Sequence, residues 1–340
     1  MKVLVTGANG FLGRAIVAEL IAENFEVEIL INRAADSEKR GNRSGVGKIW
    51  RADIRKPEQM TDLRMEGKAD IIIHSAGLAH QFKTRPAADF WEVNVGGTKN
   101  VCEAAASMKA RHLILISSVA VYGSAEDLAG KKSAAERRVG ISEDAVCEPR
   151  EIYAQSKLKS EQTAREICEK NGIRLTILRP ATIIGEGDMG NLRRLIEAID
   201  RKRFVWIGRG ENLKSLIYKG DVAAACRMLA ASDSTEKKSE VFNLTAAPIK
   251  MREIVSEIER RLDRKVPPIA FSPSFLNLVF ALNRKTFGIE KVEKLSRTVD
   301  KWLSDDVFSG EKLRAAYQYR TKTAIVEALE RETADYKRTG

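Results

Sequence analysis

A tyrosine and a lysine stand four residues apart in the stretch "IYAQSK", as Tyr153 and Lys157. The surrounding residues have the pattern of a helix, on which positions i and i+4 lie on one face. A nearby ammonium favours the phenolate form of tyrosine and lowers its pKa from about 10, which would make Tyr153 a usable general base and acid. The same spacing also occurs in ordinary amphipathic helices, so other parts of the chain must decide between the two interpretations.

A glycine-rich stretch near the N-terminus has the pattern of a dinucleotide-binding turn. The strand-like run "KVLVT" leads into "GANGFLG", with Gly7, Gly10 and Gly13, and then into a helical pattern. In such a turn the first glycine permits the tight bend, the second lets the backbone approach a pyrophosphate, and the third lets helix and strand pack closely. The pyrophosphate would lie at the N-terminus of the helix. An accidental glycine-rich turn is the less favoured alternative.

Two further positions bear on the cofactor. At the end of the second expected strand, where NAD-binding proteins usually carry an acid, stand Asn32 and Arg33. An amide bonds a ribose hydroxyl without repelling a 2′-phosphate, and Arg33 would attract one, so the choice between NAD and NADP stays open. Asp53, after the third strand, fits either an acceptor for the adenine amino group or a residue that caps the loop.

The first two-thirds of the chain alternate strands with helices, which predicts a doubly wound, Rossmann-like α/β fold. Continuous apolar strands such as "HLILISS" indicate a parallel sheet that is buried on both faces. The expected strands are Lys2–Thr6, Glu26–Ile31, Lys48–Ala52, Asp70–Ser75, His112–Ser117 and Arg174–Arg179, and the expected helices include Phe11–Ala22 and Glu151–Lys170. Ligands of such sheets bind beyond the carboxyl ends of the strands, so we expect Ser117 and Ser118 to face the cofactor cleft.

After Pro180 the pattern changes to charge-rich helices and short strands. The expected helices there are Asn191–Lys202, Met251–Arg264 and Leu276–Arg284. We therefore expect residues 1–179 to form an NAD(P)-binding domain, with returns near 215–245. Residues 180–340 would form mainly a smaller, mostly helical substrate-binding lobe.

The composition is typical of a soluble globular protein. The chain has 340 residues, of which 44% are hydrophobic, and no apolar run approaches the roughly 20 residues of a membrane span. The N-terminus enters a strand directly and lacks the pattern of a signal peptide, so we expect a cytoplasmic location. The four cysteines and three histidines are scattered, which predicts neither a disulfide framework nor a metal site.

The net charge of +11 suggests an anionic partner. The basic residues are dispersed among 47 acidic ones, without a nucleic-acid-binding motif, so we expect no nucleic acid partner. Diphosphate ligands or an anionic membrane surface would suit the charge, and a solvated basic surface is the plain alternative.

The chain resembles the extended short-chain dehydrogenase/reductase family, the NAD(P)-dependent epimerase/dehydratase group. The matching motifs, in family order, are "TGANGFLG", "DI" at 53–54, "IIHSAG", "NVGGTKNV", "SSVAVYG", "YAQSK", "LRPATIIG", "IYKGDVA" and "VFNLT". The resemblance implies that Ser118, Tyr153 and Lys157 form a catalytic triad. Around the cofactor it implies Gly7, Asn9, Gly10, Phe11, Leu12, Gly13, Asn32, Arg33, Asp53, Ile54, Ala76, Gly77, Asn94, Ser117, Lys157, Pro180 and Thr182.

Within this family the chain looks most like bacterial sugar 4-epimerases of surface-polysaccharide biosynthesis. Their substrates are hexoses or N-acetylhexosamines linked to a nucleotide or polyprenyl diphosphate. The resemblance implies substrate contacts at Ser118, Thr182, Asn191, Lys214 and Arg297. Dehydratases of the family have Thr-Asp-Glu where this chain has Ser118-Val119-Ala120, and two apolar side chains cannot transfer the proton that elimination of water needs.

Two alternatives to the epimerase remain, an NADPH-dependent carbonyl reductase of the same family and a non-catalytic dinucleotide-binding sensor. A sensor would not need both Tyr153 and Lys157. With a polyprenyl carrier, the basic charge and the apolar segment Phe271–Phe287 would suit docking at the inner face of a membrane. That segment also fits a buried helix, and the oligomeric state, with a homodimer as one option, is left open.

Overall fold

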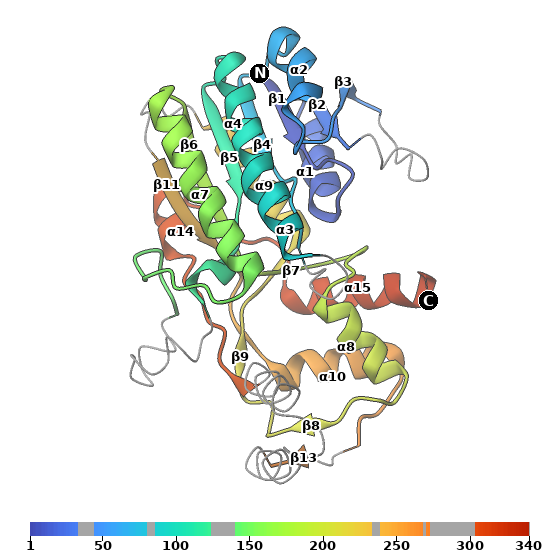
Figure 1. The fold of residues 1–340 in the computed structure, drawn as a ribbon. Coiled ribbons are helices and arrows are strands. Elements are labelled where there is room, and N and C mark those ends of the chain that lie inside the picture. The colour runs from blue at the N-terminus through green and yellow to red at the C-terminus, as the bar shows by residue number, and fades with distance from the viewer. Residues whose placement is uncertain are drawn as a thin grey trace.

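The centre of the molecule is a seven-stranded parallel sheet with the strand order β11-β6-β5-β4-β1-β2-β3 (Figure 1). The computed structural model describes residues 1–32, 44–79, 86–123, 140–232, 239–267, 270–272 and 303–339. The strands of the sheet are β1 (Lys2–Thr6), β2 (Glu26–Ile31), β3 (Val46–Arg51), β4 (Ile71–His74), β5 (His112–Ile116), β6 (Arg174–Pro180) and β11 (Ser239–Leu244). The six strands expected from the sequence are all present.

The order of the strands reverses between β1 and β4. From β1 the chain adds β2 and β3 on one side, and then crosses over to place β4, β5 and β6 on the other side. In sheets of this kind ligands bind at the carboxyl ends of the strands beside this reversal. The predicted doubly wound fold is confirmed, and it puts the segments after β1, β4 and β5 around one crevice.

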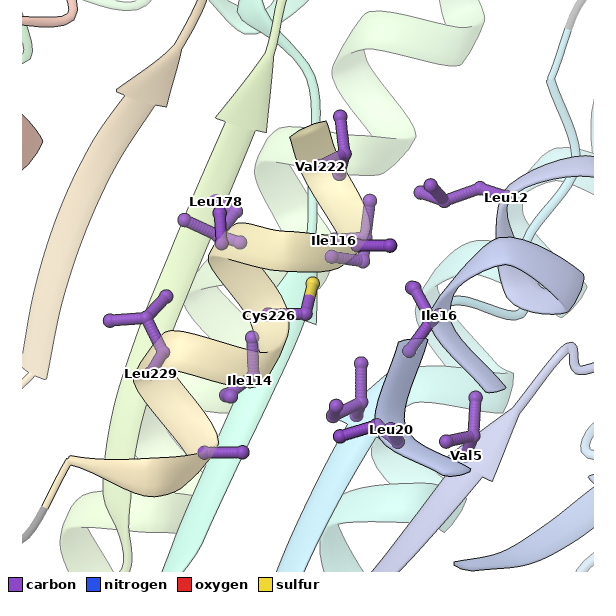
Figure 2. Packing of buried hydrophobic residues seen from close by; sticks show 14 of the residues in the cluster. Val5, Leu12, Ile16, Leu20, Ile114, Ile116, Leu178, Val222, Cys226 and Leu229 are labelled. Atoms are coloured by element: carbon purple, nitrogen blue, oxygen red, sulfur yellow. The ribbon is translucent and has the colours of Figure 1, made fainter. Parts of the chain in front are cut away.

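Helices cover both faces of the sheet, which explains why its central strands β1, β4 and β5 are buried along nearly their whole length. On one face lie α1 (Phe11–Ala22) and α9 (Lys219–Ala231), and on the other lie α2 (Thr61–Glu66), α4 (Gly97–Ser107) and α7 (Ile152–Lys170). Figure 2 shows the first face, where Leu12, Ile16 and Leu20 of α1 and Cys226 and Leu229 of α9 lie over the strands in one apolar cluster.

A second group of helices lies beyond the carboxyl ends of the strands (Figure 1). It consists of α8 (Asn191–Asp200), α10 (Met251–Leu262) and α15 (Ile325–Thr339), which pack on one another around a separate apolar core. Short strands complete this part: β7 (Thr182–Ile184) with β10 (Leu216–Tyr218), β9 (Leu213–Lys214) with β12 (Ile249–Lys250), and β8 (Trp206–Ile207) with β13 (Ala270–Phe271).

Among the described residues after 180, three elements return to the main sheet. Helix α9 packs beside α1, strand β11 pairs with β6 at the edge of the sheet, and α14 (Glu311–Tyr317) packs against β11. The division into a domain of residues 1–179 and a lobe of residues 180–340 stays a prediction.

Two segments that the sequence analysis singled out lie wholly or mostly outside the described residues. The expected helix Leu276–Arg284 lies outside the described residues, as does all of Phe271–Phe287 beyond residue 272. In the part of the chain that is described, no helix is long and apolar enough to cross a membrane.

The packing of α9 on the sheet can be tested with a matched pair of variants. Val222 is fully buried in α9, whereas Val326 in α15 is 45% exposed. We expect Val222→Ala to lower the free energy of unfolding by about 2 kcal/mol, because it removes two buried methyl groups and leaves a cavity. Val326→Ala should change it by less than about 0.5 kcal/mol. Equal effects in urea unfolding would contradict the assigned packing.

Candidate active site

The loop between β1 and α1 is shaped by glycines that leave no room for side chains. Gly7 has a φ of +69°, and a Cβ added to it would lie 2.7 Å from the backbone nitrogen of Ala76. A Cβ on Gly13 would lie 2.1 Å from the carbonyl oxygen of Gly7. The N–H of Gly10 donates to that same oxygen at 2.8 Å. The loop therefore lies directly against the segment that follows β4.

The N-terminus of α1 fits the pyrophosphate of a dinucleotide. Gly10 is its N-cap and has no side chain to cap the first N–H groups, and the first turn holds no acidic residue. These N–H groups and the helix dipole together favour an anion. Phe11 and Asn9 are half-buried beside this turn, while Leu12 and Gly13 are buried beneath it.

The residues expected to contact the adenosine part of the dinucleotide are Asn32, Arg33 and Asp53. Asn32 is exposed directly after β2, and Arg33 lies outside the described residues. The Asp53 carboxylate is held by Arg55, whose Nε and Nη2 donate to it at 3.0 and 2.6 Å, and this lowers the pKa of Asp53. It also accepts the backbone N–H of Arg55, so the loop-capping interpretation of Asp53 describes what its side chain does here.

Asn94 fixes the backbone that follows β4. Its Oδ1 accepts the N–H of Leu78 at 2.8 Å, and its Nδ2 donates to the carbonyl oxygen of Leu78 at 3.2 Å and to Ser156 Oγ at 2.9 Å. Asn94 thereby joins the loop of Ala76 and Gly77 to helix α7. A Cβ added to Gly77 would lie 3.8 Å from Lys157 Nζ, so this loop borders the catalytic candidates.

Tyr153 lies at the start of α7 and hydrogen-bonds with the side chain of Ser118. Its ring meets Phe90 edge-on, with the ring centroids 6.5 Å apart. Ser118 is the N-cap of the short helix η4 (Val119–Tyr122), and its Oγ accepts the N–H of Ala120 at 3.1 Å. Tyr153, the first residue of "YAQSK", therefore lies beside the residues that follow β5.

In the structure the pKa of Tyr153 is raised, whereas Lys157 and a bound nicotinamide together were expected to lower it. Burial raises the pKa of Tyr153, and only the hydrogen bond with Ser118 opposes this. The Lys157 ammonium, one turn along the same helix, donates to the carbonyl oxygen of Ile116 at 2.6 Å. Burial lowers the pKa of Lys157 itself to about 8, and Glu161 one turn further along the helix opposes that shift.

Ser117 does not turn its hydroxyl towards the cleft. Its Oγ donates to Glu161 Oε1 at 2.5 Å, beneath the site. Any contact of Ser117 with a dinucleotide would therefore have to come from its backbone. This differs from the expectation that both serines face the cleft, because successive residues of an extended chain point in opposite directions.

The sequence reasoning missed two buried residues that belong to this region. His74, at the end of β4, bonds Thr6 Oγ1 at 2.7 Å and Thr98 Oγ1 at 3.1 Å, and burial lowers its pKa to about 3, so it is neutral. Glu161 follows Tyr153 and Lys157 at the same spacing of four, and this repeat was the signal in the sequence that could have revealed it.

The residues expected to hold the substrate differ in their surroundings. Thr182 is exposed on β7, two residues after Pro180 at the end of β6, and Asn191 is exposed at the first position of α8. Lys214 is engaged elsewhere, because its ammonium binds the carboxylate of Asp306 at 2.6 Å and the carbonyl oxygen of Ser304 at 2.9 Å. Arg297 lies outside the described residues.

Lys214 is therefore found in an ion pair and not at an open anion site. The partner comes from a segment more than 90 residues away, which sequence spacing could not indicate. Within the described ranges, no group of histidine, cysteine or acidic side chains has the arrangement of a metal site.

A loop that leads from β7 to α8, residues 185–190, is held by the last helix. Glu332 of α15 accepts the N–H of Gly185 at 2.8 Å, and Asp335 accepts the N–H of Gly187 at 2.9 Å. Glu332 is buried, and its Oε1 has no hydrogen-bond partner among the described residues. Burial and the nearby Asp188 raise the pKa of Glu332 to about 8, so its carboxyl group is mainly protonated at neutral pH.

This group should make stability depend on pH. The folded state keeps a proton that the unfolded chain releases above about pH 4.5, so stability falls as pH rises towards 8. Glu332→Gln resembles the protonated form, and we expect it to exceed the parent in unfolding free energy by about 1.4 kcal/mol or more at pH 8.5, but not at pH 4.5. Glu327→Gln, on the exposed side of α15, is the control. A constant difference across this pH range would contradict the assignment.

Comparison with known proteins shows the family of the chain. Residues 3–245 match the model of the NAD dependent epimerase/dehydratase family. A similar curated protein is the N-acetyl-alpha-D-glucosaminyl-diphospho-ditrans,octacis-undecaprenol 4-epimerase of Escherichia coli O157:H7, 28% identical over 269 residues that cover 78% of this chain and 74% of the relative. Another is a 4-hydroxy-2-methyl-3-oxo-4-farnesyl-3,4-dihydroquinoline-1-oxide ketoreductase of Stigmatella aurantiaca, 28% identical over 75% of this chain and 72% of the relative.

Solved structures show the same fold. The UDP-glucose 4-epimerase of Thermotoga maritima, with UDP-glucose, superposes with a TM-score of 0.75 at 19% identity, over 100% of this chain and 99% of the other. That of Thermus thermophilus, in complex with NAD, gives 0.73 at 22% identity, with both chains covered completely. The matched family model spans well over half of the 340 residues, and it confirms both the expected enzyme class and a nicotinamide cofactor, NAD in the family's description. This chain belongs to the NAD-dependent epimerase/dehydratase family.

Proposed function

We propose that this protein is an NAD-dependent 4-epimerase of a hexose or N-acetylhexosamine linked to a polyprenyl diphosphate. The observation that carries the proposal is the meeting of Ser118, Tyr153 and Lys157 at the carboxyl end of β5, beside the glycine loop of β1. This arrangement provides one proton-transfer group, one hydrogen-bond donor and one cation at the crevice where the family's cofactor fits.

The proposed reaction uses these three side chains in turn. Tyr153 takes the proton of the C4 hydroxyl as the carbon is oxidised, and gives it back when the carbon is reduced on the opposite face. Ser118 hydrogen-bonds the same oxygen and stabilises the charge that develops there. Lys157 stays an ammonium and favours the phenolate of Tyr153. NAD, when bound, supplies the oxidation and its reversal.

The residues after Ser118 support epimerisation over dehydration. Val119 is buried and Ala120 is a methyl side chain, and both lie in the short helix η4 that follows the catalytic serine. Neither can donate or accept a proton, so the site has no second acid–base pair there for the elimination of water.

A basic end of the substrate-binding part supports the polyprenyl carrier. Around β8 lie four exposed cations, Arg201, Lys202, Arg203 and Arg209, together with Val205, whose side chain is 53% exposed. This end is remote from the sheet in Figure 1. Cations with an exposed apolar side chain suit an anionic membrane surface, where a polyprenyl-linked substrate is anchored, and the relative from Escherichia coli acts on such a substrate. We include peripheral membrane contact at this end in the proposal.

A carbonyl reductase is the second candidate, because a ketoreductase is among the similar curated proteins. The two activities differ in their use of cofactor. A reductase consumes reduced cofactor in proportion to product, whereas an epimerase recycles it. Mass spectrometry of the small molecules released on denaturing the purified protein would show retained NAD for the epimerase.

The role of Tyr153 can be tested by removing one oxygen. Tyr153→Phe keeps the ring that packs on Phe90 but loses the phenol. We expect turnover to fall by about 10²–10⁴, the range for loss of a general acid–base, while NAD affinity and the melting temperature stay near those of the parent. Turnover within a few-fold of the parent would remove Tyr153 from the mechanism.

The carrier can be tested with two substrates and a matched pair of lysine variants. We expect equilibration at C4 for N-acetylglucosamine on undecaprenyl diphosphate in preference to UDP-N-acetylglucosamine. We also expect binding to vesicles that contain anionic phosphatidylglycerol. Lys202→Glu should weaken vesicle binding about fivefold or more, since each cation near the surface contributes about 1 kcal/mol.

Lys109→Glu is the control for this experiment, because Lys109 is also exposed and also has a φ of 55°, but follows α4 at the far end of the sheet. Equal binding by both variants would exclude the surface around β8. Equilibration of the UDP-linked sugar alone would move the substrate to the nucleotide-linked class.

A further inference from the structure

Three consecutive residues at the end of β5 are each bound by a different residue of α7. The carbonyl oxygen of Ile116 accepts from Lys157, the hydroxyl of Ser117 donates to Glu161, and the side chain of Ser118 bonds Tyr153. The three helix residues are 153, 157 and 161, which share one face because they are spaced by four. Glu161 is thus the third residue of α7 that bonds the end of β5, and the three bonds together align the proposed catalytic groups.

Glu161 is held in a buried ion pair. Its Oε1 accepts from Arg179 Nε at 3.0 Å, its Oε2 accepts from Arg179 Nη2 at 2.6 Å, and the side chains are only 2% and 6% exposed. The guanidinium also lies 4.8 Å from the centre of the Tyr122 ring. Desolvation makes such a pair a weak source of stability, and an apolar pair of similar size often serves as well. Its presence under the site therefore calls for another explanation.

The charge of Glu161 acts on Lys157. Burial lowers the pKa of Lys157 to about 8, and Glu161 is the group that raises it. Among the described residues, the other titratable groups beside the site on β4, α7 and η4 are uncharged near neutral pH: His74 has a pKa of about 3, Tyr153 has a raised pKa, and Tyr122 has a pKa of about 12. Arg179 on β6 is a cation, which Glu161 neutralises.

We propose that Glu161 is a positioning residue of this active site, which keeps Lys157 an ammonium and, through Ser117, holds the end of β5 in register with Tyr153. Loss of the Lys157 proton would remove the cation that favours the phenolate. Loss of the bond to Ser117 would free the residue next to Ser118. The inference deepens the proposed function and rests on its assignment of Lys157, but the titration of Lys157 can be measured without any activity.

The test is an NMR titration of Lys157 in protein with ¹³C-labelled lysine ε-carbons, with the resonance assigned by its loss in Lys157→Arg. We expect the parent to titrate near pH 8. Glu161→Gln removes the charge but keeps the size and an acceptor oxygen, so we expect Lys157 to titrate lower by about one pH unit. Ser117→Ala, the control, removes the hydroxyl without changing a charge, and should leave the titration in place while lowering kcat.

Glu161→Gln leaves the buried Arg179 without its counter-ion, and this can prevent folding. The double variant Glu161→Gln/Arg179→Met removes both charges, and we expect a downward displacement that is smaller than in the single variant, because loss of the Arg179 cation offsets part of the loss of the carboxylate. An unchanged titration of Lys157 in the folded single or double variant would overturn the proposal.

Activity provides a second and separate readout. Because the ammonium is lost at lower pH in the variant, the alkaline limb of the pH–kcat profile should move down by the same amount. If neither sugar substrate reacts, the proposed function fails while the NMR result still decides on Glu161. If the sugar reacts normally and the titration stays in place, only the role of Glu161 fails.

Discussion

The hydrogen bond from the Lys157 ammonium to the carbonyl oxygen of Ile116 is the interaction on which the candidate site depends. It joins α7 to the end of β5 and so sets where Tyr153 meets Ser118. The ammonium of Lys157 is buried. In a buried site a hydrogen bond from a charged donor is strong, but burial also lowers the pKa of the donor, so that Lys157 loses its proton more easily. The surrounding structure, from the apolar sheet to the Glu161–Arg179 pair, both excludes water from this joint and supports its charge.

The topology of the sheet, and not a large set of special residues, brings together the loops beside this hydrogen bond. Parallel strands place their carboxyl ends at one edge, so the glycine loop after β1, the loop after β4 and the serines after β5 come together through topology alone. Asn94 then fixes the middle loop to α7 through Ser156. Gly7 and Gly13 let the backbone segments approach to distances that a side chain would block.

The parts that the sequence predicted are those governed by local pattern. Continuous apolar runs gave the strands, and the spacing of "YAQSK" gave the helix that carries Tyr153 and Lys157. Contacts between residues far apart in the chain could not be predicted. Lys214 binds Asp306 and Ser117 binds Glu161, and the spacing of neither pair indicates a contact. The direction of the Tyr153 pKa was also missed, because burial depends on the packed structure and not on the motif.

We propose that Tyr153, Ser118 and Lys157 serve an oxidation at C4 that is reversed on the same sugar molecule. The most direct measurement follows a polyprenyl-diphosphate-linked N-acetylhexosamine that carries deuterium at C4, in ordinary water with catalytic enzyme. We expect the epimer to form with the deuterium still at C4 and without net formation of reduced cofactor. Loss of the deuterium to solvent, or reduced cofactor formed in proportion to a ketone product, would contradict it.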